Sequence, residues 1–208
     1  SFKDPNSKEA LALYQPATAL LALHTAPDVP YPRVDMLRLL LQSVLVQGPG
    51  TLHNLAATLA VKLCLGLTNT DLPAVTGSLL SQHSRVRSAC LAGLTEAPVL
   101  QTHEEMDMDV VAYLYCARSD TDEDNRAEAE LAWSTYAYQV DTALCESLVK
   151  LLSISGVPHV RQSAARAIAL AIAEVPESAE QVFESLQSLY TENPTHFGSD
   201  NPLSERFS

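Results

Sequence analysis

Every second residue from 120 to 124 is an aspartate: Asp120, Asp122 and Asp124. This spacing could bind calcium through carboxylate oxygens. A calcium loop between two helices also needs a glycine at its sixth position and a bidentate glutamate at its twelfth. Asn125 and Leu131 occupy those positions instead. The acids precede a helical pattern, and the positive end of a helix dipole favours carboxylates. We therefore interpret them as helix-capping residues, with Thr121 and Asp124 as a capping box.

Other residue types that carry chemistry do not combine into a site. The acidic cluster of residues 103–109 lacks the second histidine, four residues after the first, that a helical zinc pair needs. The Gly-Pro-Gly of residues 48–50 lacks the Gly-Lys-Ser/Thr of a phosphate loop and favours a turn. The six histidines are scattered, so no Ser/His/Asp or Cys/His set can be assembled. We therefore expect no catalytic residue, no metal site, no cofactor and no enzymatic activity.

The cysteines are spaced like buried residues of a repeat. They stand 26 to 29 residues apart, each inside an apolar helical stretch, at Cys64, Cys90, Cys116 and Cys145. A zinc knuckle needs pairs two to four residues apart, and a secreted disulfide framework is denser. The first residues contain no signal-peptide core, and no apolar run reaches the roughly 18 residues of a membrane span. These patterns predict a cytoplasmic protein without direct membrane contact.

The charge balance limits the classes of partner. The chain has a formal net charge of −12 with only 13 Lys and Arg among 208 residues. Surfaces that bind nucleic acid or anionic lipid need clustered basic residues that replace counterions. We therefore expect little direct nucleic-acid binding by this chain alone.

One pattern recurs along the chain and organises it. Residues 157–172 predict a helix, with Pro158 in its first turn and small or apolar residues on one face at steps of three and four. The same Val-Arg-x-x-Ala pattern recurs upstream, and its arginines, Arg87, Arg126 and Arg161, stand 39 and then 35 residues apart. A period of this length is typical of stacked helical hairpins. The fold class predicted is therefore all-α, an α-solenoid of antiparallel helix pairs.

The repeated arginines and one group of aromatic residues are the candidate contact residues. An arginine at this position in stacked hairpins ties one loop to its neighbour, so we favour inter-repeat contacts for Arg87, Arg126 and Arg161 over partner contacts. Trp133 lies close in sequence to Tyr113 and Tyr115. Aromatic residues at helical spacing belong more often to a core than to a partner hot spot, and we favour core positions here too.

About ten helices are expected in a single continuous domain over residues 1–190, with residues 191–208 as a flexible loop or tail. Gly156 is expected in a left-handed cap that ends a helix. Missing polar caps at the two ends predict a segment of a longer protein. The expected helices cover residues 7–24, 37–46, 51–65, 71–80, 84–94, 110–116, 126–133, 144–154, 157–172 and 177–190.

The arginine pattern resembles the second helix of HEAT repeats. A narrower resemblance starts at Tyr-Cys-Ala-Arg-Ser-Asp of residues 115–120 and continues through Asn125, Arg126, Ala129 and Trp133. With the motif of residues 160–164 one repeat later, residues 75–190 resemble the family of the general control non-derepressible protein one.

This resemblance implies a non-enzymatic HEAT-repeat scaffold segment in a ribosome-associated translational regulator. Members of that family bind stalled or collided ribosomes and promote activation of the amino-acid-starvation kinase, which phosphorylates initiation factor two. The implied partners are the ribosome, through the full-length protein, and the kinase with its co-regulators, outside this segment. A HEAT adaptor of another class, such as a phosphatase scaffold or a transport receptor, is the alternative.

Overall fold

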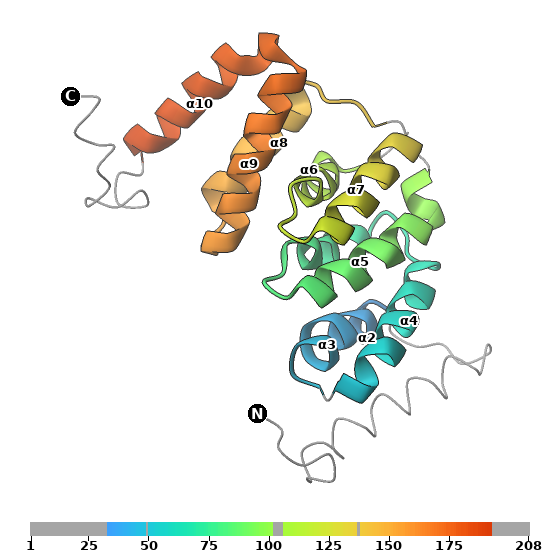
Figure 1. Cartoon of the computed structure of the whole chain (residues 1–208). Helices are drawn as coiled ribbons and strands as arrows, with labels where there is room; N and C mark the ends of the chain where they lie inside the picture. The colour runs from blue at the N-terminus through green and yellow to red at the C-terminus, as the bar shows by residue number, and fades with distance from the viewer. Residues whose placement is uncertain (1–32, 49, 102–105, 137, 193–208) are drawn as a thin grey trace. The chain divides into compact units, whose positions relative to one another are not determined.

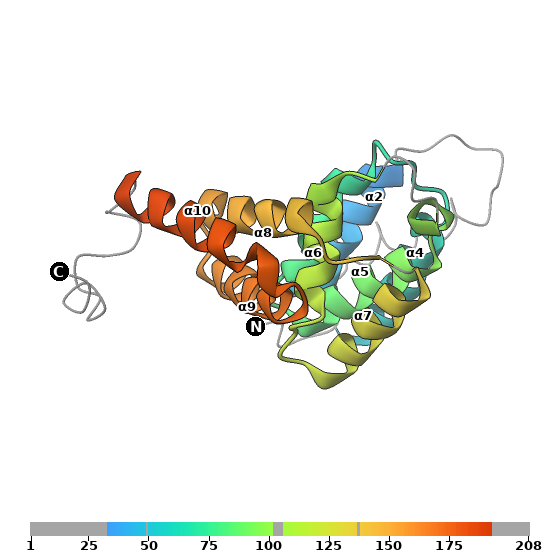
Figure 2. The same cartoon turned by 90° about the horizontal axis from the view of Figure 1, so that it is seen from above.

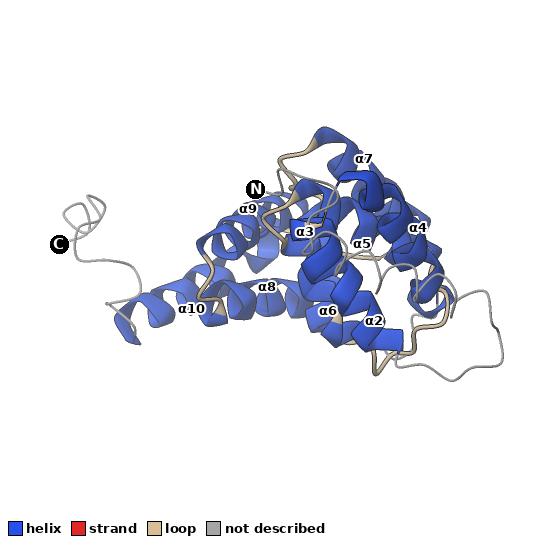
Figure 3. Cartoon of the chain, turned by 90° about the horizontal axis from the view of Figure 1, so that it is seen from below, coloured by secondary structure: helices blue, strands red, loops and turns tan. Residues whose placement is uncertain are grey.

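Helices account for nearly all the regular structure in the computed structural model, which describes residues 33–48, 50–101, 106–136 and 138–192. No strand occurs among those residues, as Figure 3 shows, and the all-α fold class is confirmed. The helix expected at 7–24, residues 103–105 of the acidic cluster and the tail from 193 onward lie outside the described residues.

The chain divides between Tyr138 and Gln139 into two compact units. Each unit has its own helix contacts, and each is described below by itself. Continuity of one solenoid over residues 1–190 stays a prediction.

The described part of the first unit contains six α-helical segments with short 3-10 and π-helical segments between them. They are α2 (Arg33–Leu39), η1 (Leu40–Val44), α3 (Leu45–Gln47), η2 (Gly50–Leu52), α4 (His53–Cys64), η3 (Leu72–Ala74), η4 (Thr76–Leu80), α5 (Ser84–Glu96), η5 (Pro98–Gln101), α6 (Met108–Ala117) and α7 (Glu123–Thr135). The segments from α2 to α3 follow one another directly, so the helix expected at 37–46 is present, with a π-helical middle.

The second helices of successive hairpins form one layer of the first unit. α5 packs against α4 on one side and against α7 on the other (Figure 1). The first elements of the hairpins form the other layer, where α6 packs against η4, and α4 connects the two layers through its contact with η1. Leucines from both layers fill the core, and Leu37, Leu59, Leu79, Leu91 and Leu114 are almost fully buried. This two-layer stacking is the arrangement that the repeat predicted.

The expected helix at 71–80 is wrong in detail. Two 3-10 turns, η3 and η4, replace it, and Val75 between them has a φ of −120°. Pro73 lacks an N–H for the backbone ladder, and Gly77 lowers helix propensity. The chain therefore stays helical only in short turns here, and this layer is thinner at the second hairpin.

Three α-helices form the second unit over its described residues, 139–192. α8 (Thr142–Ile154) and α9 (Pro158–Glu174) form a hairpin, and α10 (Ala179–Glu192) follows the turn η7 (Pro176–Ser178) and packs against α8 (Figures 1 and 2). Small residues on α9, Ala164 and Ala167, are fully buried. Their size lets the backbones of packed helices approach closely.

Aspartate caps begin three of the helices. The side chains of Asp107, Asp122 and Asp141 accept backbone N–H bonds at the starts of α6, α7 and α8. Each such cap contributes about 1 kcal/mol of stability. The predicted capping box of Thr121 and Asp124 is therefore wrong, because Asp122 takes the capping position. Gly156 does not adopt the expected left-handed conformation, since its φ lies outside the positive range.

All four cysteines are buried and free, which confirms that they are core residues. Burial raises the pKa of Cys64 to about 12 and raises the pKa of Cys90 and Cys116. Such thiols stay protonated and chemically inert at neutral pH.

Gly93 sets the distance between α4 and α5. A Cβ atom added at Gly93 would lie 2.6 Å from the Cys64 Sγ and 3.4 Å from the Val61 Cα. We expect Gly93→Val to reduce the free energy of unfolding by about 1–3 kcal/mol, because the core would be overpacked. Urea unfolding measures the change. Gly77→Ala is the control, because a Cβ there meets no atom within 4 Å. Equal unfolding midpoints for the two variants would contradict this account.

Candidate functional site

Arg87 forms the most buried ion pair that the structure describes. It lies on α5, and its Nε donates to the Asp120 Oδ2 at 2.6 Å while its Nη2 donates to the Oδ1 at 2.7 Å. The two side chains are 6% and 3% exposed. Asp120 belongs to the turn between α6 and α7, so the contact joins two successive hairpins. A bidentate contact of this kind fixes orientation as well as distance.

Further hydrogen bonds satisfy the remaining polar groups around this pair. The Arg87 Nη1 donates to the Ser81 carbonyl at 2.8 Å. The Asn125 Nδ2 donates to the Ser84 carbonyl at 3.3 Å and to the Asp120 Oδ2 at 3.4 Å. Asn125 is itself 3% exposed. The second and third hairpins are therefore held together by a closed polar network, which a buried ion pair needs to be stable.

The pKa of Asp120 records the balance of these forces. Burial raises it, but the Arg87 hydrogen bond, the Asp122 backbone N–H, the Arg87 charge and the Asn125 amide together bring it below its ordinary value of 3.8. The ionised form is therefore the one that the folded chain stabilises.

The other two repeated arginines make contacts within their own hairpins. The Arg126 Nη1 donates to the Asp120 carbonyl at 3.1 Å, in the turn just before its own helix. The Arg161 Nη1 donates to the Ser155 carbonyl at 3.0 Å, also in the preceding turn. The structure therefore brings Arg87 and Arg126 to the same turn and leaves Arg161 apart in the second unit.

The aromatic candidates divide into a cluster and one separate ring. Trp133 is 6% exposed, and its ring centroid lies 4.9 Å from that of Tyr115 and 5.3 Å from that of Tyr138. Tyr115 is fully buried. Tyr113 is half-buried against the core, and burial, followed by Cys116 and Asp109, raises its pKa. Trp133 and Tyr115 are therefore core residues, and Tyr113 has a partly accessible ring.

Arg118 is a contact residue that sequence reasoning did not single out. Its Cζ lies 4.8 Å from the Tyr115 ring centroid and 5.2 Å from that of Trp133. Its Nε donates to the Glu130 Oε2 at 2.6 Å, and Glu130 is 53% exposed. The guanidinium therefore covers the aromatic cluster by cation–π contacts. The sequence feature that could have identified Arg118 is its place in the motif of residues 115–120.

Arg85 is the other contact residue that sequence reasoning missed. It lies two residues before Arg87, and its Nη2 donates to the Val46 carbonyl at 3.1 Å while its Nε donates to the Leu45 carbonyl. It thereby caps the end of α3 and ties the first hairpin to the second. Its adjacency to the repeated arginine was the available signal.

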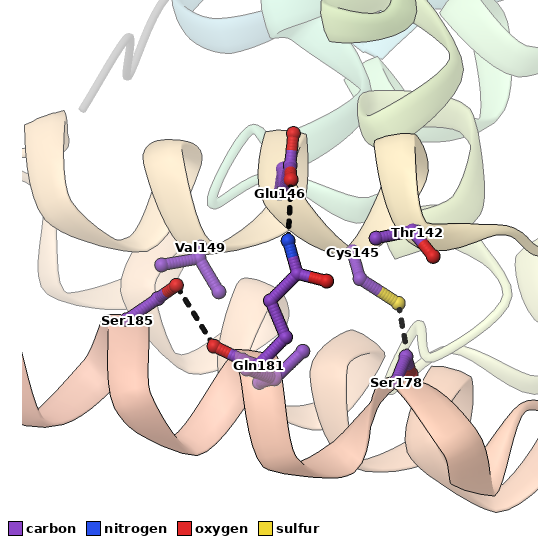
Figure 4. Close-up of a pocket in the computed structure, with 8 residues that line it drawn as sticks. Thr142, Cys145, Glu146, Val149, Ser178, Gln181 and Ser185 are labelled. Atoms are coloured by element: carbon purple, nitrogen blue, oxygen red, sulfur yellow. Dashed lines mark hydrogen bonds between the residues drawn. The ribbon is translucent and has the colours of Figure 1, made fainter.

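A small cavity lies between α8 and α10 in the described part of the second unit. Its volume is about 10 Å³, and Figure 4 shows Cys145 and Ser178 at one end, with the Gln181 amide donating to Glu146 at 2.7 Å. This is the size of one water molecule, too small for a ligand.

Two large side chains of α10 are exposed. Phe183 is 63% exposed and Tyr190 is 47% exposed, and sequence reasoning identified neither as a surface residue.

Two of the acidic residues considered for calcium have structural partners. Asp120 binds Arg87, and Asp122 caps α7. Over the described residues, no three His, Cys, Asp or Glu side chains are grouped as a metal would require. Within the same residues, no helix combines the length and the apolar character needed to cross a bilayer.

Replacing the carboxylate of each ion pair by an amide of the same shape compares the buried Arg87–Asp120 pair with the more exposed Arg118–Glu130 pair. We expect Asp120→Asn to lower the free energy of unfolding by about 3–5 kcal/mol, because it leaves the Arg87 charge buried and unpaired. Glu130→Gln is the matched control, and should cost at most about 1 kcal/mol because Glu130 is exposed. Equal losses in urea unfolding would contradict the distinction.

The same Asp120 variant predicts a change in acid sensitivity. Because the folded pKa lies below the unfolded value of 3.8, the contribution of Asp120 is present above that value. It is lost as the pH falls through the lower, folded pKa. Unfolding free energies measured between about pH 5 and 2 should therefore fall less steeply for Asp120→Asn than for the unchanged chain.

Truncating the central ring of the aromatic cluster tests its core position. Trp133→Ala should reduce the free energy of unfolding by about 3–5 kcal/mol, since a large buried side chain is lost. Leu131→Ala is the control on the same helix, because Leu131 is 68% exposed and should contribute less than about 0.5 kcal/mol. A Trp133 variant as stable as the Leu131 variant would place the indole at the surface.

Comparisons with known proteins extend the resemblance over most of the chain. The family described as "Stalled ribosome sensor GCN1, HEAT repeats" matches residues 101–199. The mouse protein named "Stalled ribosome sensor GCN1" is 27% identical over 91% of this chain, and the human protein of the same name is 29% identical over 77%. The "eIF-2-alpha kinase activator GCN1" of Dictyostelium discoideum is 28% identical over 90%.

The matched region is a small part of those proteins. The chain spans 6% to 8% of the length of these three relatives. No solved structure matches it significantly. The family match, the three relatives and the stacked helical hairpins agree that the chain is similar to HEAT-repeat segments of GCN1 proteins.

Proposed function

We propose that this chain is a non-enzymatic scaffold segment of a ribosome-associated translational regulator that senses stalled or collided ribosomes. The regulator promotes activation of the kinase for initiation factor two during amino-acid starvation. The mouse and human relatives are named stalled ribosome sensors, and the Dictyostelium relative is named an eIF-2-alpha kinase activator. Similarity to these proteins over up to 91% of the chain is the observation that carries the proposal.

The internal contacts support a spacing role for this segment. The Arg87–Asp120 pair and the Asn125 amide join neighbouring hairpins through directional bonds rather than through apolar packing alone. Directional bonds set the rotation between hairpins, and small rotations per repeat accumulate into the curvature of a solenoid. A segment built in this way holds flanking contacts of a long scaffold at a defined separation.

The charge supports weak ribosome binding by this segment alone. A net charge of −12 opposes a direct contact with RNA phosphates. In the whole protein, affinity for the ribosome would come from several weak contacts linked along one chain, each raising the effective concentration of the next. We place the kinase and its co-regulators on other parts of that protein. We also propose a cytoplasmic location, no cofactor and no direct membrane contact.

Three forms of the full-length protein test this role. The first is intact, the second lacks residues 139–192, which removes the described part of the second unit from its boundary onward, and the third carries Asp120→Asn. We expect starvation-induced kinase activation to fall severalfold in the deletion, because the spacing of flanking contacts changes. Glu130→Gln in the full-length protein is the matched control and should keep full activation.

Ribosome co-sedimentation of the isolated 208-residue chain completes the test. We expect pelleting close to background, because the segment is acidic. Full activation by a stably expressed deletion variant would overturn the scaffold role. Tight pelleting of the isolated chain that weakens steeply with salt would show instead that the segment contacts RNA directly.

A further inference from the structure

A groove of about 310 Å³ lies between the first two hairpins of the first unit. Leu41, Gln42 and Val46 line one wall, on the helix that contains the π-helical segment η1. The turns η3 and η4 form the opposite wall, with Gly77 facing open space. The volume is within the range of ligand-binding clefts in proteins, roughly 300–1,000 Å³.

The groove follows from the irregular first layer of the unit. Where a full helix was expected at 71–80, the two 3-10 turns present the small residues Ala74, Gly77 and Ser78. Short turns and small side chains fill less of the space between neighbouring hairpins than a helix with large side chains. On the other wall, the π-helical segment η1 widens the helix, a feature that often accompanies binding sites.

Two arginines donate hydrogen bonds to backbone carbonyls of residues that line the groove. The Arg38 Nε donates to the Ala74 carbonyl at 3.2 Å, and the Arg85 Nη2 donates to the Val46 carbonyl at 3.1 Å. Ala74 and Val46 both line the groove. Because each guanidinium is anchored on a backbone carbonyl, its position is defined before any ligand binds, which reduces the entropy lost on binding.

These two cations lack a carboxylate partner within the chain as described. The ion pairs of this region belong to Arg87 and Arg118, whereas Arg38 and Arg85 are exposed and form no ion pair with any described residue. The exposed carboxylate of Asp35, one turn before Arg38, makes no such pair either. In a chain of net charge −12, two uncompensated arginines beside one groove favour an anionic ligand.

We propose that this groove binds an extended acidic peptide segment of a partner protein. Apolar or small side chains of the peptide would contact the accessible groove residues Val46, Pro73 and Ala74, and two of its carboxylates would accept hydrogen bonds from Arg38 and Arg85. Along the helix, Arg38 and Val46 are about 12 Å apart at about 1.5 Å per residue. An extended peptide covers this distance in about four residues. The peptide would therefore carry acidic residues four positions apart.

A peptide fits this groove better than a nucleic acid does. The groove walls combine apolar side chains with backbone carbonyls, and only two cations flank them. Single-stranded nucleic acid is bound instead through a continuous basic groove and aromatic stacking surfaces. The inference goes beyond the scaffold role and does not depend on ribosome binding, because it rests on the groove and its two arginines.

The experiment uses fluorescence polarisation with the 208-residue chain and labelled eight-residue peptides. Each peptide has Asp or Glu at two positions four residues apart, with Val, Ala or Ser elsewhere. The reference peptides have Asn or Gln at the two acidic positions. We expect saturable binding of acidic peptides that is at least about tenfold tighter than that of the amide peptides and weakens with salt.

Variants of the chain locate the binding. Gly77→Leu fills the groove from a position where a Cβ meets no atom within 4 Å, and Gly156→Leu is the matched control at an equally open glycine of the second unit. We expect Gly77→Leu and the double variant Arg38→Gln, Arg85→Gln each to weaken binding at least about tenfold. Gly156→Leu should leave it unchanged. Melting temperatures check that the variants fold, since Arg85 also caps α3.

Several results would overturn the proposal. The acidic peptides could show no saturable binding up to about 1 mM. Alternatively, a folded Gly77→Leu variant could bind them as tightly as the unchanged chain does. Tighter binding of single-stranded RNA, with displacement of the peptide, would assign the groove to nucleic acid. None of these results depends on kinase activation or ribosome pelleting, so they leave the scaffold role to its own test.

Discussion

The buried contact between Arg87 and Asp120 constrains the first unit more than any other polar interaction in it. Both charges are almost completely removed from water, so each is tolerated only because the other is in bidentate contact. The carboxylate must therefore stay where the turn before α7 presents it, and α5 must stay where its guanidinium can reach that turn. Asn125 completes the same network by reaching back to Ser84. The relative position of the second and third hairpins follows from a handful of directional bonds, while the leucine core supplies most of the favourable burial.

The two layers of the first unit differ in how far they accept larger side chains or irregular helix geometry. In the layer of α4, α5 and α7, close packing leaves no room for change, as the approach of Gly93 to Cys64 shows. In the other layer, a π-helical segment and two 3-10 turns replace regular helices without loss of the core, because Leu72 and Leu79 stay buried. Irregularity is thus confined to the layer where it opens a groove beside Arg38 and Arg85. The layer of α4, α5 and α7 therefore fixes the packing of the hairpins, whereas the other layer varies in helix type and contains the groove.

The acidic character of the chain is partly a requirement of its helices. Asp107, Asp122 and Asp141 begin three helices, and Asp120 neutralises Arg87. In the sequence, such carboxylates resemble a metal-binding site. In the structure, their oxygens bind backbone N–H groups or Arg87 and are not available to coordinate a metal. The aromatic residues show the same effect, since Trp133 and Tyr115 are a cluster in sequence and a core in the structure, covered by Arg118. Arg38 and Arg85, which are bound to backbone carbonyls, are the charged residues that we propose for partner contacts.

The sequence by itself determined the all-α class, the hairpin period, most helix positions and the burial of the cysteines, because small and apolar residues at steps of three and four describe a helix face locally. It also singled out Arg87, since the repeat carried that residue. Only the tertiary structure decided which arginine joins two hairpins, because Arg87 and Arg161 share a local motif and differ in whether Asp120 or only a Ser155 carbonyl faces them. It also decided that residues 71–80 form two turns beside a groove, and that Asp122 rather than Thr121 caps α7. The contacts of Arg87 with Asp120 and of Asn125 with Ser84 join residues 33 and 41 positions apart, and a local pattern contains no information about a neighbour that distant.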